Sequence, residues 1–232
     1  MSVEQRRVEP VVATVEVPPG VLGPSPVTFE VRSFVAAGPE GLVLIDTGPP
    51  GNAASIGRAI AALGAEWADV ADIVLTHHHF DHAGGLRETA DLAPRARISS
   101  GAEDASAIVL DGDRNPLPLA DGQRVGAFRV VATPGHTAGH ISLLDEEGSL
   151  VLIGDLVGSE RGELTFGPPS FTADPVLNTR SLRRILKLDP ARMLFSHGEE
   201  LPDPARAIRL LLDETSSSPP PDLRGARDNQ QR

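Results

Sequence analysis

The stretch THHHFDHAGG, residues 76–85, holds four of the seven histidines in this 232-residue chain. It directly follows DIVL (72–75), a short apolar run with the length of a buried β-strand. His77 and His79 are two residues apart, so in extended backbone their side chains point to the same side and could bind one ion together. Because neutral imidazole suits zinc and iron, the stretch is a candidate metal site.

The same stretch contains two more candidate ligands, Asp81 and His82, at the point where two glycines let the chain turn into a helix. Three further candidates, His136, Asp155 and His197, lie in later segments that each follow an apolar run. These are more ligands than one tetrahedral ion can use, which favours two metals about 3.5 to 4 Å apart. The candidate ligands are His77, His79, Asp81, His82, His136, Asp155 and His197.

Short apolar runs of strand length alternate with helical patterns along the chain, which favours sheets covered by helices. In such folds the ends of strands are where binding residues converge, because loops can meet there while the sheet stays rigid. Asp46 lies at one of these ends, directly beyond LVLI (42–45). The expected strands are 11–17, 27–35, 42–45, 72–75, 129–132, 151–153 and 193–195, and the expected helices are 52–64, 180–188 and 204–212.

Two segments have the composition of loops. Residues 158–174 are rich in Gly, Pro and Ser, and we expect a loop whose Phe166 and Phe171 are candidate walls of a substrate pocket. Residues 216–232, SSSPPPDLRGARDNQQR, have almost no apolar side chains, and we expect a disordered tail. The chain therefore predicts one domain over residues 1–215.

The composition excludes several classes of protein. The chain has no cysteine, which excludes a disulfide framework, a thiol nucleophile and thiolate zinc sites. Its formal net charge of -11 disfavours nucleic acid or an anionic membrane as a partner. No signal-peptide core precedes Pro10, and no run approaches the roughly 18 to 20 apolar residues of a membrane-spanning helix. We expect a cytoplasmic protein that acts on a small molecule.

Four motifs occur in a fixed order: THHHFDHAGG (76–85), GHT (135–137), GD (154–155) and SHG (196–198). In this order they resemble the metallo-β-lactamase superfamily, and more narrowly its glyoxalase II-like metallohydrolases. The resemblance covers about two thirds of the chain. It implies an α/β fold of the α+β type, a four-layer αβ/βα sandwich, with two metals in the cleft between two sheets. Two divalent ions that share a water lower its pKa, which would give a hydroxide nucleophile at neutral pH.

The resemblance also implies a role for each site residue. Three histidines would bind the first metal: His77, His79 and His136. Three residues would bind the second metal: Asp81, His82 and His197. Asp155 would bridge the two metals, and Asp81 would also orient the nucleophile, which makes it the candidate catalytic residue. Asp46 and His140 would contact ligands rather than the metals, and His78 matches no ligand position. The expected ions are two zinc ions, with iron or manganese as alternatives.

Departures from the family's patterns bear on the substrate. Asp155 at the third motif and the absence of cysteine exclude the β-lactamases that use a Cys ligand. The absence of tyrosine and the single lysine weigh against glutathione thioesters, and the missing tyrosine also weighs against lactonases that use one. The expected function is hydrolysis of a small ester, thioester, lactone or amide. The alternatives are a mononuclear Fe(II) persulfide dioxygenase-like oxidoreductase and a phosphodiesterase or nuclease, which the net charge disfavours.

Overall fold

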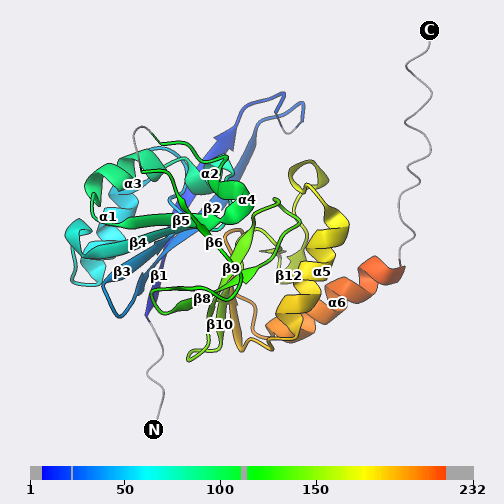
Figure 1. Ribbon diagram of the computed structural model, residues 1–232. Helices are drawn as coiled ribbons and strands as arrows, with labels where there is room; N and C mark the ends of the chain where they lie inside the picture. Colours follow the sequence, from blue (N-terminus) through cyan, green and yellow to red (C-terminus); the bar gives the residue numbers. More distant parts are fainter. Residues whose placement is uncertain (1–6, 22, 111–113, 218–232) are drawn as a thin grey trace.

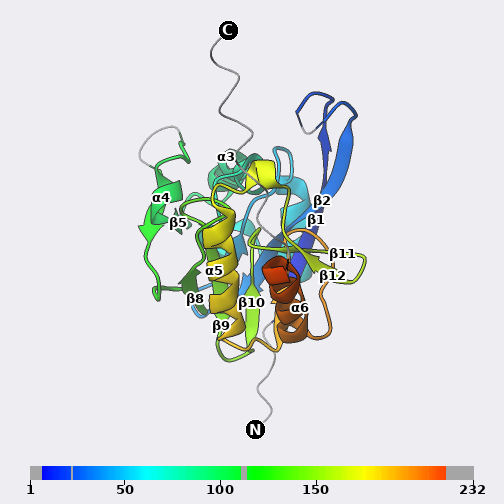
Figure 2. The ribbon, with the colours of Figure 1, turned by 90° about the vertical axis from the view of Figure 1, so that its right-hand side faces the viewer.

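Two β-sheets pack face to face, and helices cover the outer face of each sheet (Figures 1 and 2). The computed structural model describes residues 7–21, 23–110 and 114–217. The layers follow the order helix, sheet, sheet, helix, so the expected four-layer αβ/βα sandwich is confirmed. Among the described residues, no helix combines the length and the apolarity that crossing a membrane requires.

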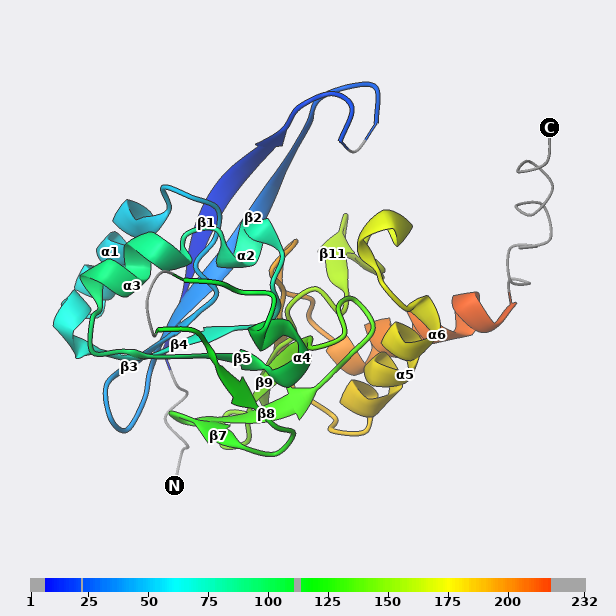
Figure 3. The same cartoon turned by 45° about the horizontal axis from the view of Figure 1, so that its top comes forward.

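The first sheet has the strand order β1-β2-β3-β4-β5-β6. β1 and β2 form a long antiparallel hairpin that extends beyond the body of the molecule (Figure 3), whereas β3 to β6 run parallel. The strands are β1 (Val8–Val17), β2 (Val27–Ala37), β3 (Leu42–Ile45), β4 (Val70–Leu75), β5 (Arg97–Gly101) and β6 (Leu117–Leu119).

The second sheet has the strand order β13-β10-β9-β8-β7. β9 is antiparallel to both β8 and β10, and β10 is parallel to β13, so β8, β10 and β13 all point the same way. The strands are β7 (Arg124–Val125), β8 (Phe128–Ala132), β9 (Ile141–Asp145), β10 (Leu150–Leu152) and β13 (Arg192–Leu194), and a separate hairpin comprises β11 (Gly158–Glu160) and β12 (Glu163–Thr165).

The helices form the two outer layers and the connections near the strand ends (Figure 2). α1 and α3 cover the first sheet, and α5 and α6 cover the second. The helices are α1 (Ala53–Ala62), η1 (Trp67–Asp69), α2 (Phe80–Ala83), α3 (Leu86–Leu92), α4 (Ala102–Ala105), η2 (Pro169–Phe171), α5 (Pro175–Leu186) and α6 (Pro204–Ser217).

Strand β3 shows why its apolar run is continuous rather than alternating. Val43 and Ile45 pack into the cluster between the two sheets, which includes Phe128 of the second sheet. Leu42 and Leu44 point the other way and pack under the helices of the outer layer. Because both faces of the strand are covered, all four residues are buried, as is typical of parallel strands in layered folds.

The expected strands and helices are all present, with shifted ends. The helix expected from residue 180 begins five residues earlier, because Asp174 accepts a hydrogen bond from the backbone N–H of Leu177 and a proline follows at the first helical position. The prediction of a loop over 158–174 is wrong in part, since the segment contains the β11–β12 hairpin and η2. Of the expected tail, Ser216 and Ser217 end α6, and 218–232 lie outside the described residues.

Candidate metal centre

The strand directions bring the candidate ligands to one edge of the sandwich. β3 and β4 of the first sheet and β8, β10 and β13 of the second each have a histidine or aspartate at or just beyond their carboxyl ends. The seven candidate ligands form two groups, within each of which the ligand atoms lie within 4.8 Å of one another. The first group is His77, His79 and His136, and the second group is Asp81, His82, Asp155 and His197.

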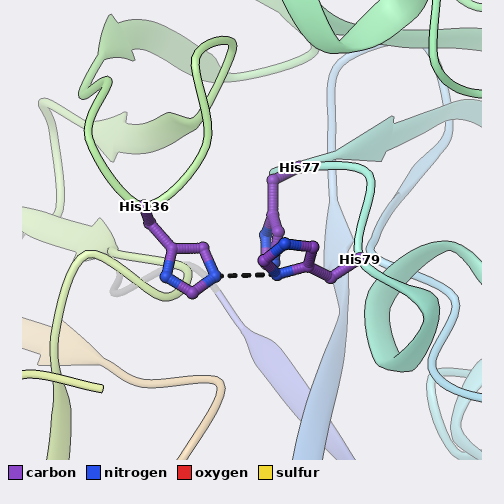
Figure 4. A group of neighbouring side chains, drawn as sticks. All are labelled: His77, His79 and His136. Carbon is purple, nitrogen blue, oxygen red and sulfur yellow. Dashed lines mark hydrogen bonds between the residues drawn. The ribbon is translucent and has the colours of Figure 1, made fainter. Parts of the chain in front are cut away.

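The first group is a triangle of imidazole rings whose centroids lie 4.7 Å apart in each pair (Figure 4). His77 and His79 come from the segment after β4, and His136 reaches toward them from the loop after β8. Nε2 of His136 lies 2.9 Å from Nδ1 of His79. The three side chains therefore direct ring nitrogens toward one point from two loops that are distant in sequence.

The second group is centred on Asp155, which lies in the turn after β10. Its Oδ1 lies 3.2 Å from Nε2 of His82, and its Oδ2 lies 3.2 Å from Nε2 of His197. Oδ2 of Asp81 lies 3.4 Å from the same nitrogen of His197. The two carboxylates and two imidazoles thus alternate around a common centre.

Asp155 also faces the first group. Its Oδ2 lies 3.6 Å from Nε2 of His136 and 3.9 Å from Nε2 of His77. The same oxygen is 3.2 Å from Nε2 of His197 in the second group. The Asp155 carboxylate is therefore shared between the two groups, which is the position that a bridging ligand requires.

The donor set fits divalent metal ions. His77 is fully buried, and its Nε2 has no hydrogen-bond partner among the described residues. Its Nδ1 lies 3.1 Å from the Thr76 hydroxyl, which itself donates to the Asp46 carboxylate. The hydroxyl therefore accepts from Nδ1–H, and the lone pair of Nε2 is directed into the group. A buried nitrogen lone pair without a donor is unfavourable unless a cation occupies the site.

The first group is held in its neutral form. Burial lowers the pKa of His77 well below its usual range, and the neighbouring His82 lowers it further. Burial likewise lowers the pKa of His136 to about 4 and lowers that of His79. Neutral imidazole is the form that binds metal, so these side chains need not lose a proton to do so at pH 7.

The second group has the opposite electrostatics. Burial works to lower the pKa of His197, but the Asp155 carboxylate outweighs it and raises the pKa to about 10. Burial also works to lower the pKa of His82, but Asp155 and Asp46 outweigh it and raise the pKa well above its usual range. The negative charge of the carboxylates therefore attracts positive charge to this point, in the form of protons or of a metal ion.

Asp46 contacts a ligand and shapes a turn at the same time. Its Oδ2 lies 2.8 Å from Nδ1 of His82, whose Nε2 faces the second group. Its Oδ1 accepts the backbone N–H of Thr76 at 2.7 Å. Asp46 itself has a φ of 57°, a left-handed conformation that aspartate tolerates better than most residues. Asp46 therefore joins the candidate ligand His82 to the start of the segment after β4.

His140 holds the backbone of Asp155, the residue whose carboxylate the two groups share. Its Nε2 accepts the backbone N–H of Asp155 at 3.0 Å, and its Nδ1 lies 2.9 Å from the Thr133 hydroxyl. Burial lowers the pKa of His140 to about 3, which matches its role as an acceptor. Gly154 has a φ of 60°, and a Cβ there would lie 2.6 Å from Nε2 of His140, so the close approach requires glycine.

Two residues of β2 contact His197, and no local pattern in the sequence indicates either of them. The carbonyl oxygen of Glu30 accepts a hydrogen bond from Nδ1 of His197 at 2.8 Å. The Phe29 ring lies with its centroid 5.4 Å from that of His197. These residues are about 167 positions away from His197 in the chain, so only the fold could reveal the contacts.

The two candidate pocket phenylalanines lie in different surroundings. Phe171 is half-buried, and its ring centroid lies 6.1 Å from that of His79 in the first group. Phe166 is also half-buried, but it packs against the apolar cluster between the second sheet and α5 and α6. The structure therefore places Phe171 beside the first group and Phe166 against the apolar core of the outer layer.

Asp104 is a buried aspartate near the centre that lies outside all four sequence motifs. Its carboxylate accepts hydrogen bonds from the loops after β4 and β8. Burial works to raise its pKa, but hydrogen bonds from Thr137, His78 and Gly139 outweigh this effect and lower the pKa. No local signal in the sequence marks Asp104, because the strand that precedes it, β5 (RISSG), has no apolar pattern of its own.

The motifs, the four-layer fold and the two groups together define the class of protein. The model of the metallo-beta-lactamase superfamily matches residues 27–197, and the chain belongs to this superfamily. The resemblance noted in the sequence is thereby confirmed, including its distant relation to hydroxyacylglutathione hydrolases.

Comparison with individual proteins agrees with this assignment. The chain is 40% identical over 122 residues to a hydroxyacylglutathione hydrolase from Ectopseudomonas mendocina, covering 52% of this chain and 45% of the relative. It spans about half the length of the hydroxyacylglutathione hydrolases that it matches.

Two solved structures show the same fold. A metallo-beta-lactamase family protein from Thermus thermophilus superposes with a TM-score of 0.65 at 25% identity, covering 89% of this chain and 79% of the other. The protein TTHA1623, solved in a di-iron-bound form, superposes with a TM-score of 0.60 at 29% identity, covering 88% of this chain and 99% of the other.

Proposed function

We propose that this chain is a hydrolase that uses two divalent ions, zinc in the native protein, to cleave a small ester, thioester, lactone or amide. The observation that carries the proposal is the position of Asp155. One of its oxygens lies 3.6 Å from Nε2 of His136 and 3.2 Å from Nε2 of His197, and so faces both groups at once. A carboxylate between two sets of imidazoles is the arrangement that two adjacent ions need.

The first group would hold one ion and the second group the other, with Asp155 between them. When bound, such a pair of ions supplies a nucleophile at neutral pH, by lowering the pKa of water, and polarises the oxygen of the substrate. Asp81 would orient the nucleophile through its carboxylate. Burial works to raise the pKa of Asp81, but hydrogen bonding to His197 outweighs it and keeps the pKa below its usual range. The side chain is therefore an ionised acceptor.

The surroundings of the site favour acyl compounds as substrates. The rings of Phe29 and Phe171 lie beside His197 and His79, so apolar surface adjoins both groups. The name of the relatives, hydroxyacylglutathione hydrolase, describes enzymes that hydrolyse an acyl compound. This chain has no tyrosine and one lysine, and we therefore propose small acyl substrates rather than glutathione thioesters.

The test combines metal analysis with a substrate screen. Protein purified without added metal is analysed by plasma mass spectrometry, and we expect about two zinc ions per chain. The protein is then screened against p-nitrophenyl esters, lactones, thioesters, β-lactams and phosphodiesters, before and after removal of metal with a chelator. We expect turnover of an acyl compound that disappears with the metal and returns on adding zinc.

Two results would contradict the proposal. About one iron per chain, with oxygen consumption on a persulfide, would support the dioxygenase-like alternative. Preferred cleavage of phosphodiesters would instead support a phosphodiesterase. A site that retained iron in pairs would leave the hydrolase proposal in place and correct the identity of the ion, as the di-iron form of TTHA1623 suggests is feasible in this fold.

A further inference from the structure

The carboxylate of Asp104 in α4 contacts both loops that carry the first group. Its Oδ2 accepts the backbone N–H of His78 at 3.0 Å and the hydroxyl of Thr137 at 2.7 Å. The same oxygen lies 3.0 Å from Nδ1 of His78, and Oδ1 accepts the backbone N–H of Gly139 at 2.7 Å. Asp104 is only 2% exposed, so its carboxylate is shielded from water.

The partners of Asp104 are direct neighbours of metal ligand candidates. His78 lies between His77 and His79, and Thr137 directly follows His136. The residue pairs that Asp104 joins come from the loop after β4 and the loop after β8, in different sheets. A single carboxylate therefore links the segment that carries two ligands of the first group to the segment that carries the third.

Two glycines show that α4 and the loop after β8 pack in close contact. A Cβ on Gly101, just before α4, would lie 1.8 Å from the carbonyl oxygen of Gly139. A Cβ on Gly139 would lie 2.3 Å from the backbone nitrogen of Asp104. No side chain fits on either residue without moving backbone, so α4 lies directly against the loop after β8. The packing and the hydrogen bonds from Thr137 and Gly139 therefore both hold α4 against the loop after β8.

We propose that Asp104 is the positioning residue of the first group, holding the loop of His77 and His79 against the loop of His136 at the separation that one metal ion requires. This inference rests on the metal centre proposed above. It also explains two residues of the stretch GHTAGH (135–140) that bind no metal, because Thr137 supplies a hydrogen bond and Gly139 supplies the space.

The second group has supports of its own. His82 is held by the Asp46 carboxylate, and His197 is held by the carbonyl oxygen of Glu30. Loss of Asp104 should therefore weaken one metal site and spare the other. Loss of an outer partner of a metal-binding site typically lowers the metal affinity about 10- to 100-fold.

The experiment compares Asp104→Asn with the wild-type chain. The amide keeps the size of the side chain but replaces an acceptor oxygen with a donor that faces other donors. Metal-free protein is titrated with Zn²⁺ in competition with a chromophoric chelator, which yields one dissociation constant for each ion. We expect one constant to rise about 10- to 100-fold and the other to stay within about threefold of wild type.

A matched control is Asp72→Asn. Asp72 is also a buried aspartate, but it lies in β4 and pairs with Arg97. We expect this variant to unfold at a lower temperature while both zinc constants stay at their wild-type values. If Asp104 had a purely structural role, Asp104→Asn would likewise unfold at a lower temperature and keep both zinc constants.

The affected site is assigned with His136→Ala, in which the first group has lost a ligand. Adding Asp104→Asn to His136→Ala should leave the constant of the remaining ion unchanged.

Unchanged constants in Asp104→Asn, or an equal weakening of both, would overturn the proposal. If Asp104→Asn does not fold, Thr137→Val removes one of the hydrogen bonds and should weaken one constant several-fold. Failure of the wild-type chain to bind zinc would instead refute the metal centre itself.

Discussion

The carboxylate of Asp46 lies 2.8 Å from Nδ1 of His82, although the two residues are 36 positions apart in the chain. Asp46 directly follows β3, and His82 lies in α2, beyond the neighbouring strand β4. Because Nδ1–H donates to the carboxylate, the opposite ring nitrogen faces the second group. One hydrogen bond thus fixes both the orientation and the tautomer of a candidate ligand.

Replacing Asp46 tests this relationship. In Asp46→Asn, an amide donor would face the N–H of His82 or of Thr76 in a buried site, so we expect the free energy of unfolding to fall by about 1 to 3 kcal/mol. The affinity for one zinc ion should fall about 10- to 100-fold. Chelator competition and urea unfolding measure the two effects. Wild-type zinc affinity at both sites would show that Asp46 acts only on the turn.

Removal of Asp155 should abolish the metal centre as a whole. Asp155→Ala deletes the carboxylate that faces both groups, and it leaves Asp81 as the remaining carboxylate between His82 and His197. We expect loss of both ions and of turnover, measured by plasma mass spectrometry and by the best substrate of the screen.

A control for Asp155→Ala is Asp203→Ala, which removes a hydrogen bond to the backbone N–H of Arg206 at the start of α6. This variant should lose about 1 kcal/mol of stability and keep both ions. An Asp155→Ala protein that retained two ions and full activity would show that the carboxylate is not a bridge.

Phe171 and Phe166 are predicted to respond differently to truncation. Phe171→Ala should raise the KM for an aromatic ester about tenfold, the equivalent of about 1.4 kcal/mol of lost contact, with little change in the melting temperature. Phe166→Ala should lower the free energy of unfolding by about 2 kcal/mol, less than the value for a fully buried phenylalanine. Equal effects of the two variants on KM would assign both rings to the pocket, as the sequence first suggested.

The pair of Asp121 and Arg184 predicts a dependence of stability on pH. The hydrogen bond from Arg184, at 2.7 Å, holds the pKa of Asp121 below its usual range. The folded state therefore favours the ionised carboxyl, and this contribution is present above about pH 4 and lost as the pH falls through the lowered pKa. Because the pair is partly exposed, it is worth at most about 1 kcal/mol.

Urea unfolding of Asp121→Asn between pH 6 and pH 3 measures this contribution. The difference in stability from wild type should shrink as the pH falls, and Arg184→Gln should reproduce the same trend. A difference that stays constant over this range would contradict the assignment of the lowered pKa to the ion pair.

Much of the fold could be predicted from the sequence, because apolar runs and helical periodicity are local signals. LVLI (42–45) is continuously apolar since both faces of β3 are covered. Strand β5 (Arg97–Gly101) could not be predicted in this way, because a run with two serines and a glycine has no apolar pattern of its own. Its buried position comes from pairing with β4, and such pairing is a tertiary property.

The composition of segment 158–174 is misleading for a related reason. Glycine and proline are frequent in loops, yet Gly158 here begins strand β11, Gly162 lies in the turn between β11 and β12, and Pro169 begins a short helical turn. Turn-forming residues indicate that the chain changes direction, but they do not distinguish a loop from a hairpin or a short helical turn.

The sequence by itself determined which candidate metal ligands this protein carries and in what order. The ligand types, their order and the absence of cysteine are properties of the primary structure. The spacing of His77 and His79 also places both side chains on one side of an extended segment. These features were enough to indicate a site for two metals and to name the residues that would form it.

The tertiary structure alone decided how these residues are held. Asp104 joins two ligand loops, Glu30 accepts from His197, and Phe171 rather than Phe166 lies beside the centre. Each of these contacts joins segments that are distant in the chain, and their separation depends on how the two sheets pack. No local pattern of residues records that distance, so it appears only when the chain is folded.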